Sequence, residues 1–372
     1  MAHYQLSVPA RVNILGNPGD ANEGDFATIS AAVDLHAYAE VCTSNDYRLE
    51  QTDSDSPPVC FQPSDLPLPY NGQLDLLKGA VNRLYAFSKE FREKLPAHEF
   101  HIQIRSDVPR QSGLGGSSLF VLLTLAALRE LYALDPHTHN NYILAELCQR
   151  VEELELGIAA GFADRYVPLF GGLAYLDYRG KLHHADICKE PLATYERLDE
   201  YAASLPLVAV TTGVQHDSGD VHGCMRPRYL EEYADWQKRG GGMPPMVQYM
   251  SAAWETAWRG KIALLEGDLR TFGHLMNENH RLVDIMMQYC GFSDGAGWAN
   301  NLFIEAAMQN GALGAKLTGA GGGGSVFALT EPGQEEKILR LWEETAANAD
   351  LSDAQIYPLK IAFQGLKVES KE

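Results

Sequence analysis

The pattern of hydrophobic and polar positions in the first half of the chain predicts strands and helices in an irregular order. Apolar residues alternate or run together over 3–14 and 28–43, which is typical of strands, and a turn rich in Gly, Asn and Asp separates the two segments. The segment 46–70 is polar and carries five prolines, so it predicts an irregular surface connection. Further on, the pattern predicts a helix over 74–91, a strand over 99–106, a long apolar helix over 117–134 and a helix over 142–156.

The second half of the chain is predicted to be mainly helical around a few short strands. The expected strands are 172–177, 205–211 and the pair within 315–329, and the expected helices are 229–239, 245–266, 269–290, 298–310 and 334–347. Strands and helices interleave without a regular βαβ order. The pattern therefore predicts an α+β fold rather than a doubly wound parallel sheet.

The length of the chain indicates two domains. It has 372 residues, whereas a single hydrophobic core seldom grows past roughly 250–300 residues. A domain boundary is expected between residues 185 and 205, and we place the two domains at 1–195 and 196–372.

The charge of the chain argues against nucleic acid as a partner. The formal net charge is −19, and the 30 Lys and Arg residues form no basic block of the kind that binds phosphate backbones. A protein this acidic that bound a polyanion would have to concentrate its positive potential locally; alternatively, the charge serves solubility alone. No apolar run approaches the roughly 20 residues of a membrane helix, and the first residues lack the basic and apolar regions of a signal peptide. We therefore expect a cytoplasmic protein with no membrane partner, either a monomer or a homodimer.

A glycine- and serine-rich segment over 109–118 leads from a predicted strand into the apolar helix. Glycines let several backbone N–H groups point at one anion, and the positive end of the helix dipole adds to this, so the segment predicts a phosphate site. A hydroxyl in the first helical turn can also bind Mg²⁺. The alternative is a turn in which a serine caps the helix. The segment has neither the GxxxxGK[ST] nor the GxGxxG spacing, which argues against a Walker-type NTPase and a nicotinamide-binding Rossmann domain.

Two further segments carry an unusual density of Gly, Asn and Asp. The segment 316–325 has five glycines in the six residues 319–324, which indicates close approach of its backbone to another group, although a flexible turn is the alternative. The segment 9–24 brings Arg11, Asn13 and Asp20 to a polar turn. A carboxylate such as Asp20 suits paired sugar hydroxyls; capping of the turn is its alternative role.

In this order and spacing, the three segments resemble the motifs of the GHMP kinases, which include galactokinases, homoserine kinases and mevalonate kinases. The resemblance extends over nearly the whole chain, and further stretches resemble the plant-type glucuronokinases: 16–20, 108–111, 155–165, 217–222 and 276–279. The family implies two α+β domains, the first with a mixed sheet and the second similar to a ferredoxin-like sandwich. It also implies that ATP, with Mg²⁺ as cofactor, lies in the groove between them.

The resemblance implies roles for individual residues. Asp164 matches the catalytic aspartate that accepts a proton from the substrate hydroxyl, although an Asp164–Arg165 surface pair is the alternative. Arg11 matches a basic residue near the transferred phosphate, and Ser117 matches the serine that binds Mg²⁺. The family's magnesium-binding glutamate matches Glu152, whereas helical periodicity places Glu155 nearer the buried stripe. The phosphate-binding set implied by the motifs is Pro109, Gly113, Leu114, Gly115, Gly116, Ser117, Ser118, Gly321 and Gly322.

The sequence departs from galactokinases at the position that selects the substrate. Asn17-Pro18 stands where galactokinases have Glu-His, and a neutral Asn17 would accept a substrate that carries its own carboxylate at C6. Asp20 matches the aspartate that binds ring hydroxyls. The remaining candidates for the substrate set are Asp164, Arg165, His222 and Arg226, although Arg226 and Arg228 are equally consistent with a surface pair.

We therefore predict an ATP-dependent sugar kinase that phosphorylates the anomeric hydroxyl of a uronate, with D-glucuronate favoured and D-glucuronate 1-phosphate as product. The alternatives are a kinase for a neutral hexose, a heptose phosphate or a mevalonate-type acid. A third alternative is a catalytically silent protein that senses sugar and ATP, against which the presence of Ser117, Asp164 and the third glycine segment argues.

Overall fold

The structure, a computed structural model, describes most of the chain. The described residues are 2–21, 26–158, 161–181, 186–187, 189, 191–201, 205–214, 218–319 and 321–371.

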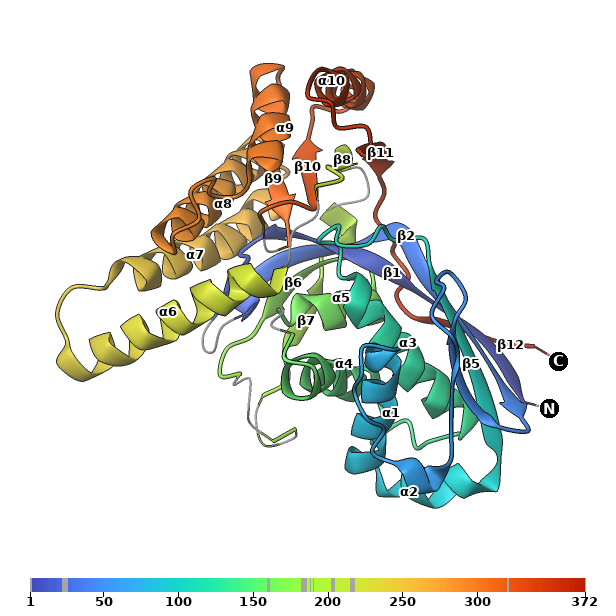
Figure 1. Cartoon of the computed structure of the whole chain (residues 1–372). Helices are drawn as coiled ribbons and strands as arrows, with labels where there is room; N and C mark the ends of the chain where they lie inside the picture. The colour runs from blue at the N-terminus through green and yellow to red at the C-terminus, as the bar shows by residue number, and fades with distance from the viewer. Residues whose placement is uncertain are drawn as a thin grey trace.

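A mixed sheet of eight strands, counted over these residues, forms the first part of the fold (Figure 1). Its main path runs β12-β1-β2-β5-β3-β4, with β6 on β2 and β7 on β6; β3 and β5 are parallel and the other pairs are antiparallel. The strands are β1 (His3–Leu15), β2 (Ala27–Ser44), β3 (Tyr47–Gln51), β4 (Val59–Phe61), β5 (Glu99–Ser106), β6 (Leu173–Asp177), β7 (Thr194–Arg197) and β12 (Lys367–Ser370).

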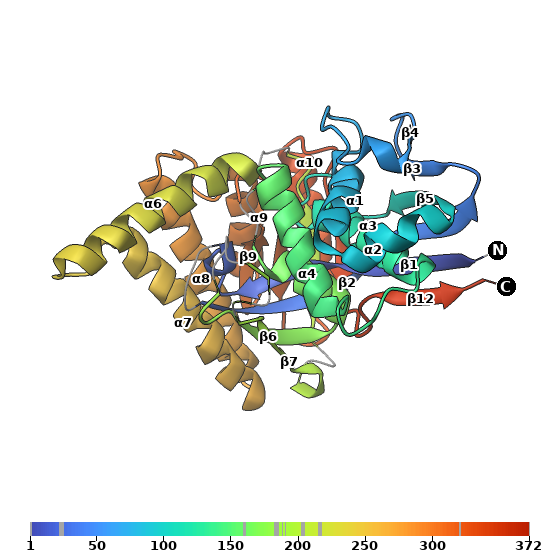
Figure 2. The same cartoon turned by 90° about the horizontal axis from the view of Figure 1, so that it is seen from below.

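Helices cover one side of the long β1–β2 ribbon, as both views show (Figures 1 and 2). The central helix α3 is apolar on almost every side and packs against β1, β2 and α1, so its glycine-rich start is held rigidly beside the sheet. The helices are α1 (Asp75–Phe87), α2 (Lys89–Lys94), α3 (Gly116–Leu131), α4 (Asn141–Arg150), a π-helix (Val151–Glu155) and α5 (Ala163–Phe170). Short 3₁₀ turns occur at Gly19–Ala21, Pro63–Asp65, Leu95–Ala97 and Asp199–Tyr201.

The second part of the fold is an antiparallel sheet in the order β11-β8-β10-β9, with long helices beside it. Its strands are fully buried except β11, and they carry Val and Ala side chains toward α9 and α10. The elements are β8 (Leu207–Thr211), α6 (Ser218–Arg239), α7 (Pro245–Leu265), α8 (Leu269–Tyr289), α9 (Trp298–Gln309), β9 (Gly314–Thr318), β10 (Ser325–Leu329), α10 (Glu335–Asn348) and β11 (Gln355–Leu359).

The last strand returns to the first sheet. β12 pairs antiparallel with β1, so the two ends of the chain lie close together (Figures 1 and 2). The predicted division into 1–195 and 196–372 stays a prediction. The pairing of β12 shows that the end of the chain contributes a strand to the first sheet.

The predicted α+β class with a mixed sheet in its first part is confirmed, and the second part contains an antiparallel sheet with helices beside it. Two local predictions were wrong. The segment 46–70 contains β3 and β4, because Tyr47 and Leu49 alternate with polar neighbours and are buried in the sheet. Helix α6 begins at Ser218 rather than near residue 229, with Pro227 inside it, and Val221 and Met225 are buried on one side. No helix in the described part of the chain is both long and apolar enough to cross a bilayer.

Candidate active site

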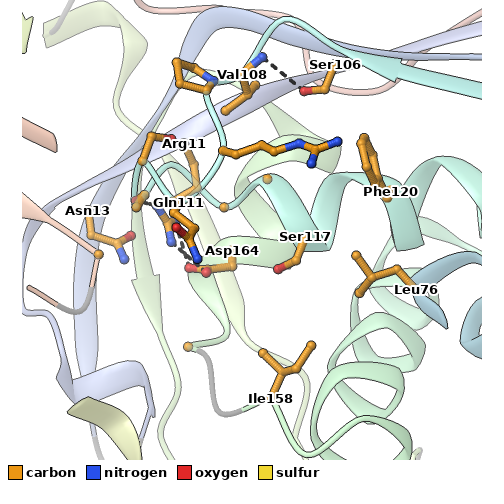
Figure 3. A pocket seen from close by; sticks show the side chains of 18 of the residues that line it. Arg11, Asn13, Leu76, Ser106, Val108, Gln111, Ser117, Phe120, Ile158 and Asp164 are labelled. Carbon is orange, nitrogen blue, oxygen red and sulfur yellow. Dashed lines mark hydrogen bonds and ion pairs between the residues drawn. The ribbon is translucent and has the colours of Figure 1, made fainter. Parts of the chain in front are cut away.

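A cavity of about 770 Å³ opens where the first turn of the chain, the central glycine loop and the third glycine loop meet. Arg11 and Asp164 meet at one end, and Leu76 and Phe120 lie at the other, with Ser117 between them (Figure 3). The cavity therefore has a charged end and a more apolar end, which suits a ligand with a polar head and a flat apolar group.

The charged end is built on an arginine–carboxylate pair. Arg11 on β1 donates through Nε to Asp164 Oδ1 at 2.7 Å and through a terminal nitrogen to Oδ2 at 2.6 Å. A third donor of the same guanidinium contacts the carbonyl oxygen of Gly113. Both side chains are almost fully buried. This two-point contact fixes the orientation of the carboxylate. Asp164 and Arg165 are both buried, so the alternative of an Asp164–Arg165 surface pair is wrong.

A second carboxylate, Asp20, lies beside this pair. Its Oδ2 accepts a hydrogen bond from the backbone N–H of Ala163 at 3.0 Å. A Cβ atom at Gly161 would lie only 2.1 Å from the same oxygen, so a larger residue there would displace the Asp20 carboxylate. Burial, and secondly the charge of Asp164, raise the pKa of Asp20 to about 6, although the Ala163 N–H, Arg11 and Arg165 oppose the shift. Two carboxylates thus share one cavity, and Arg11 pairs directly with only one of them.

Glu152 is the glutamate of the π-helix that faces the central glycine loop. Its Oε1 accepts from Ser117 Oγ at 2.7 Å, and its Oε2 accepts from Ser118 Oγ at 2.7 Å. Arg165 lies 2.6 Å from Oε2, and both partners of this pair are fully buried. The two neighbouring glutamates pair elsewhere: Glu153 with Arg226, and Glu155 with Arg83.

The start of α3 presents its backbone N–H groups without a side-chain cap. Gly115, in the left-handed conformation at φ 84°, precedes the helix, which begins at Gly116. Ser117 therefore lies inside the first turn, and its hydroxyl donates to Glu152 rather than capping the helix. Unpaired N–H groups at the positive end of a helix form a site for an anion. Ser117 lines the cavity, whereas Ser118 and Leu114 are buried.

The third glycine loop packs directly on the central one. A Cβ atom at Gly113 would lie 2.7 Å from the carbonyl oxygen of Thr318, and one at Gly319 would lie 2.9 Å from Gly113 Cα. Gly319 lines the cavity. Gly321 and Gly322, which sequence reasoning placed at the phosphates, have other neighbours.

The Gly322 N–H donates to the carbonyl oxygen of Ala296 at 2.8 Å. A Cβ atom at Gly321 would lie 2.8 Å from Met287 Sδ. The glycines of this loop therefore allow its backbone to pack closely against neighbouring segments. A high number of glycines in the sequence is consistent with this role and with phosphate binding, so it does not distinguish the two.

Comparison with known proteins identifies the family. Residues 76–172 match the N-terminal domain model of the GHMP kinases, and residues 261–348 match the C-terminal model. The sequence is 30% identical to a probable glucuronokinase 2 of Arabidopsis thaliana, over 97% of this chain and 94% of that protein. The chain belongs to the GHMP kinases.

Other GHMP kinases of different specificity are similar at comparable levels. A D-glycero-alpha-D-manno-heptose 7-phosphate kinase of Campylobacter jejuni is 25% identical over 91% of this chain and 93% of its own. A galactokinase of Streptomyces coelicolor is 28% identical over 94% and 90%. The structure of Lactococcus lactis galactokinase superposes with a TM-score of 0.76 at 19% identity over 98% of this chain and 95% of that one, which shows a shared fold. As a GHMP kinase, the protein is an ATP-dependent small-molecule kinase.

The turn after β1 supplies Asn17 and Asp20 to the cavity lining. The side-chain oxygen of Asn17 accepts from Lys316 Nζ at 2.7 Å, and its backbone oxygen accepts from Asn279 Nδ2 at 2.9 Å. Sequence reasoning did not assign either partner. The available signal for Lys316 was a lysine within an otherwise apolar, fully buried strand, β9.

The basic residues proposed for a uronate on α6 of this GHMP kinase lie elsewhere. Arg226 donates to both oxygens of Glu153 at 2.9 Å and does not line the cavity. Arg228 pairs with Glu232 and lies over the ring of Tyr289. We therefore withdraw Arg226 from the proposed substrate set, because its charge already has a partner. His222 falls within α6, but its side chain lies outside the described part of the structure.

The apolar end of the cavity contains residues that sequence reasoning missed. Leu76 and Phe120 lie together at this end (Figure 3), and Val108, Ser106 and Gln51 also line the cavity. In an ATP-dependent kinase, this end suits the adenine ring. No motif marks such residues, because an apolar wall uses the same side chains as the core.

Proposed function

We propose that this GHMP kinase transfers the γ-phosphoryl group of ATP to the anomeric hydroxyl of a uronate, with D-glucuronate as the favoured substrate. The observation that carries the proposal is the pairing of Asp164 with Arg11 in the cavity that also receives the N-terminus of α3. A proton acceptor and an anion site thus face the same space, as transfer of a phosphoryl group to an alcohol requires.

In the proposed reaction, the adenine lies at the apolar end and the phosphates lie at the start of α3. The anomeric oxygen forms a bond to Pγ, the bond from Pγ to the bridging oxygen of ADP breaks, and Asp164 takes the hydroxyl proton. Arg11 holds Asp164 in place by two hydrogen bonds and keeps positive charge beside the transferred group. We expect the proton to move late, as the anomeric oxygen bonds to phosphorus.

We assign a magnesium ion to Ser117, which lines the cavity, and to Glu152, which accepts its hydrogen bond. Their oxygens lie 2.7 Å apart at the start of α3, and hard oxygen donors in small number suit Mg²⁺, which takes further ligands from phosphates and water. When bound, Mg²⁺ neutralises negative charge that develops on the phosphates. The role of Arg165 is to pair with the second oxygen of Glu152 and so to hold the first oxygen toward Ser117.

The choice of a uronate is supported by Asn17. The residue is neutral where the resemblance to galactokinases would place a glutamate, and it lines the cavity together with Asp20, which we assign to the ring hydroxyls. The similarity to a probable glucuronokinase 2 supports the same substrate. The product would be D-glucuronate 1-phosphate.

A panel of acceptors tests the proposal. The purified protein is assayed with ATP and D-glucuronate, D-galacturonate, D-glucose, D-galactose, a heptose phosphate or mevalonate, with ADP as the readout. We expect kcat/KM for D-glucuronate to exceed that for the neutral hexoses by about 10²-fold, because a neutral CH₂OH group at C6 cannot form the charge-assisted hydrogen bond that a carboxylate forms. ³¹P–¹H NMR should place the new phosphate on C1. Preference for a neutral hexose, or phosphate on another carbon, would contradict the uronate assignment.

A further inference from the structure

A buried lysine lies directly behind the turn that we assign to substrate selection. Lys316 is on β9, and its side chain is fully buried. Its Nζ contacts three oxygens: the backbone oxygens of Asn13 and Leu317 at 3.0 Å and Asn17 Oδ1 at 2.7 Å. An ammonium group has three N–H donors and no acceptor, so three acceptors satisfy the charged form completely.

The charge of Lys316 has no carboxylate partner among the described residues. No ion pair to Lys316 occurs among these residues. Burial, and secondly the nearby charge of Arg11, hold the pKa of Lys316 well below its usual range. By contrast, the Asp164 carboxylate in the same region is paired with Arg11. A buried cation without a counter-charge is unfavourable. An anionic ligand in the adjacent cavity would oppose this shift and favour the charged form of Lys316.

Lys316 also determines which face Asn17 shows to the cavity. Because Nζ donates to Oδ1, the amide nitrogen Nδ2 must point away from Lys316. That nitrogen is buried and has no hydrogen-bond partner among the described residues. Asn17 is only 2% exposed, yet it lines the cavity. Buried N–H groups are nearly always paired in the functional state, so this donor indicates an acceptor atom on the substrate.

We propose that Lys316 is a specificity-determining positioning residue, which orients Asn17 as a hydrogen-bond donor and supplies the positive potential that selects a substrate with a carboxylate at this end of the cavity. The inference rests on the proposed function, because it names the group that recognises the C6 carboxylate of a uronate. It assigns to Lys316, acting through Asn17, the role that sequence reasoning gave to an arginine on α6.

Two variants test the inference. Lys316→Met removes the charge and the donor to Asn17 at similar length. Asn17→Asp is nearly isosteric, keeps Lys316 in place as its ion-pair partner and turns the second oxygen of the side chain toward the cavity. For each variant, kcat and KM are measured with D-glucuronate and with D-glucose, alongside thermal unfolding.

We expect both variants to lower kcat/KM for D-glucuronate by about 10–100-fold, mainly through a higher KM. The loss for D-glucose should be about tenfold smaller, since a neutral CH₂OH group gains little from the charge. Lys78→Met is the matched control. Lys78 is another buried lysine, but it pairs with Asp75 on α1, so its loss should reduce stability and leave the ratio between the two substrates unchanged.

The outcomes separate the two proposals. If the unmodified protein phosphorylates D-glucuronate but both variants lose activity equally on both sugars, Lys316 has only a structural role and the inference is overturned, while the proposed function stands. If the unmodified protein has no preference for a uronate, the proposed function fails in that first measurement and the inference fails with it.

Discussion

The carboxylate of Asp164 is held by an arginine in a cavity that is otherwise poor in direct charge pairs. Replacement by asparagine keeps the shape and one acceptor for Arg11 but removes the proton acceptor. We expect Asp164→Asn to lower kcat by about 10²–10⁴-fold and to leave KM for ATP nearly unchanged, because the phosphates contact other groups. Steady-state kinetics with both substrates varied measures the two effects. Near-normal turnover would remove Asp164 from the role of proton acceptor.

Asp20 illustrates a conflict between stability and function at a single residue. Its pKa in the folded protein is about 6, above the ordinary value of 3.8. Between these two values the folded state binds more protons than the unfolded state, so the contribution of Asp20 to the free energy of unfolding falls as the pH rises, and the full penalty is present above pH 6. The site therefore keeps a destabilising charge at neutral pH.

Replacing Asp20 by asparagine should remove this penalty. We expect Asp20→Asn to be more stable than the unmodified protein at pH 8, by about 1–3 kcal/mol, with the difference shrinking toward pH 4. The affinity for the sugar substrate should fall at the same time, because an amide oxygen accepts hydrogen bonds from ring hydroxyls more weakly than a carboxylate does. Urea unfolding at both pH values measures the change in stability, and KM for the sugar measures the change in substrate affinity. A variant that is less stable at pH 8 would show that the buried charge is already compensated.

Among the elements, the π-helix Val151–Glu155 is where sequence reasoning was least able to place side chains. A continuous α-helix over 142–156 would set Glu155 beside the buried stripe, but the wider π-turn changes the angular positions after Arg150 and brings Glu152 to Ser117. The apolar pattern of α3 and the glycines before it, by contrast, are local signals, and they predicted the turn and the helix that follows it directly. The pairing of Glu152 depends on contacts made by distant segments, which no local pattern contains.

The two serines of α3 should separate metal binding from stability. Both donate to Glu152, but Ser117 lines the cavity and Ser118 is fully buried. We expect Ser117→Ala to raise the Mg²⁺ concentration for half-maximal rate by about tenfold. Ser118→Ala should instead lower the free energy of unfolding by about 1–3 kcal/mol with a smaller effect on the metal. Titration of Mg²⁺ in activity assays and urea unfolding give both numbers. Equal effects on Mg²⁺ from the two changes would mean that the ligand is assigned wrongly.

Across the whole molecule, the cavity depends on contacts between segments far apart in the sequence. Asn13 donates its backbone N–H to Thr318 Oγ1, and Lys316 reaches Asn17 across the same junction. The sequence indicated that all three glycine segments belong to one site, because their order resembles a known family. It could not show that the third segment meets the first through a lysine, or that Arg226 is already paired. Those outcomes depend on tertiary packing, which decides which of several charged residues faces the ligand.

The packing of the third glycine loop on the central one gives the last prediction. Gly319 and Gly333 both have positive φ, at 84° and 82°, so an alanine at either position carries the same backbone strain of roughly 1–2 kcal/mol. They differ in surroundings: a Cβ atom at Gly319 would lie 2.9 Å from Gly113 Cα, whereas nothing lies within 4 Å of one at Gly333.

Gly319→Ala should therefore push the two loops apart. We expect it to lower the free energy of unfolding by about 1–3 kcal/mol more than Gly333→Ala, and to raise KM for ATP at least about tenfold, because the central loop and the start of α3 would move together. Gly333→Ala should leave both kinetic constants unchanged. Urea unfolding and ATP kinetics on the two variants make the comparison, in which backbone strain cancels. If the two alanines behaved alike, contact between the loops would contribute nothing beyond strain, and the ATP site would not depend on the junction between the central and third glycine segments.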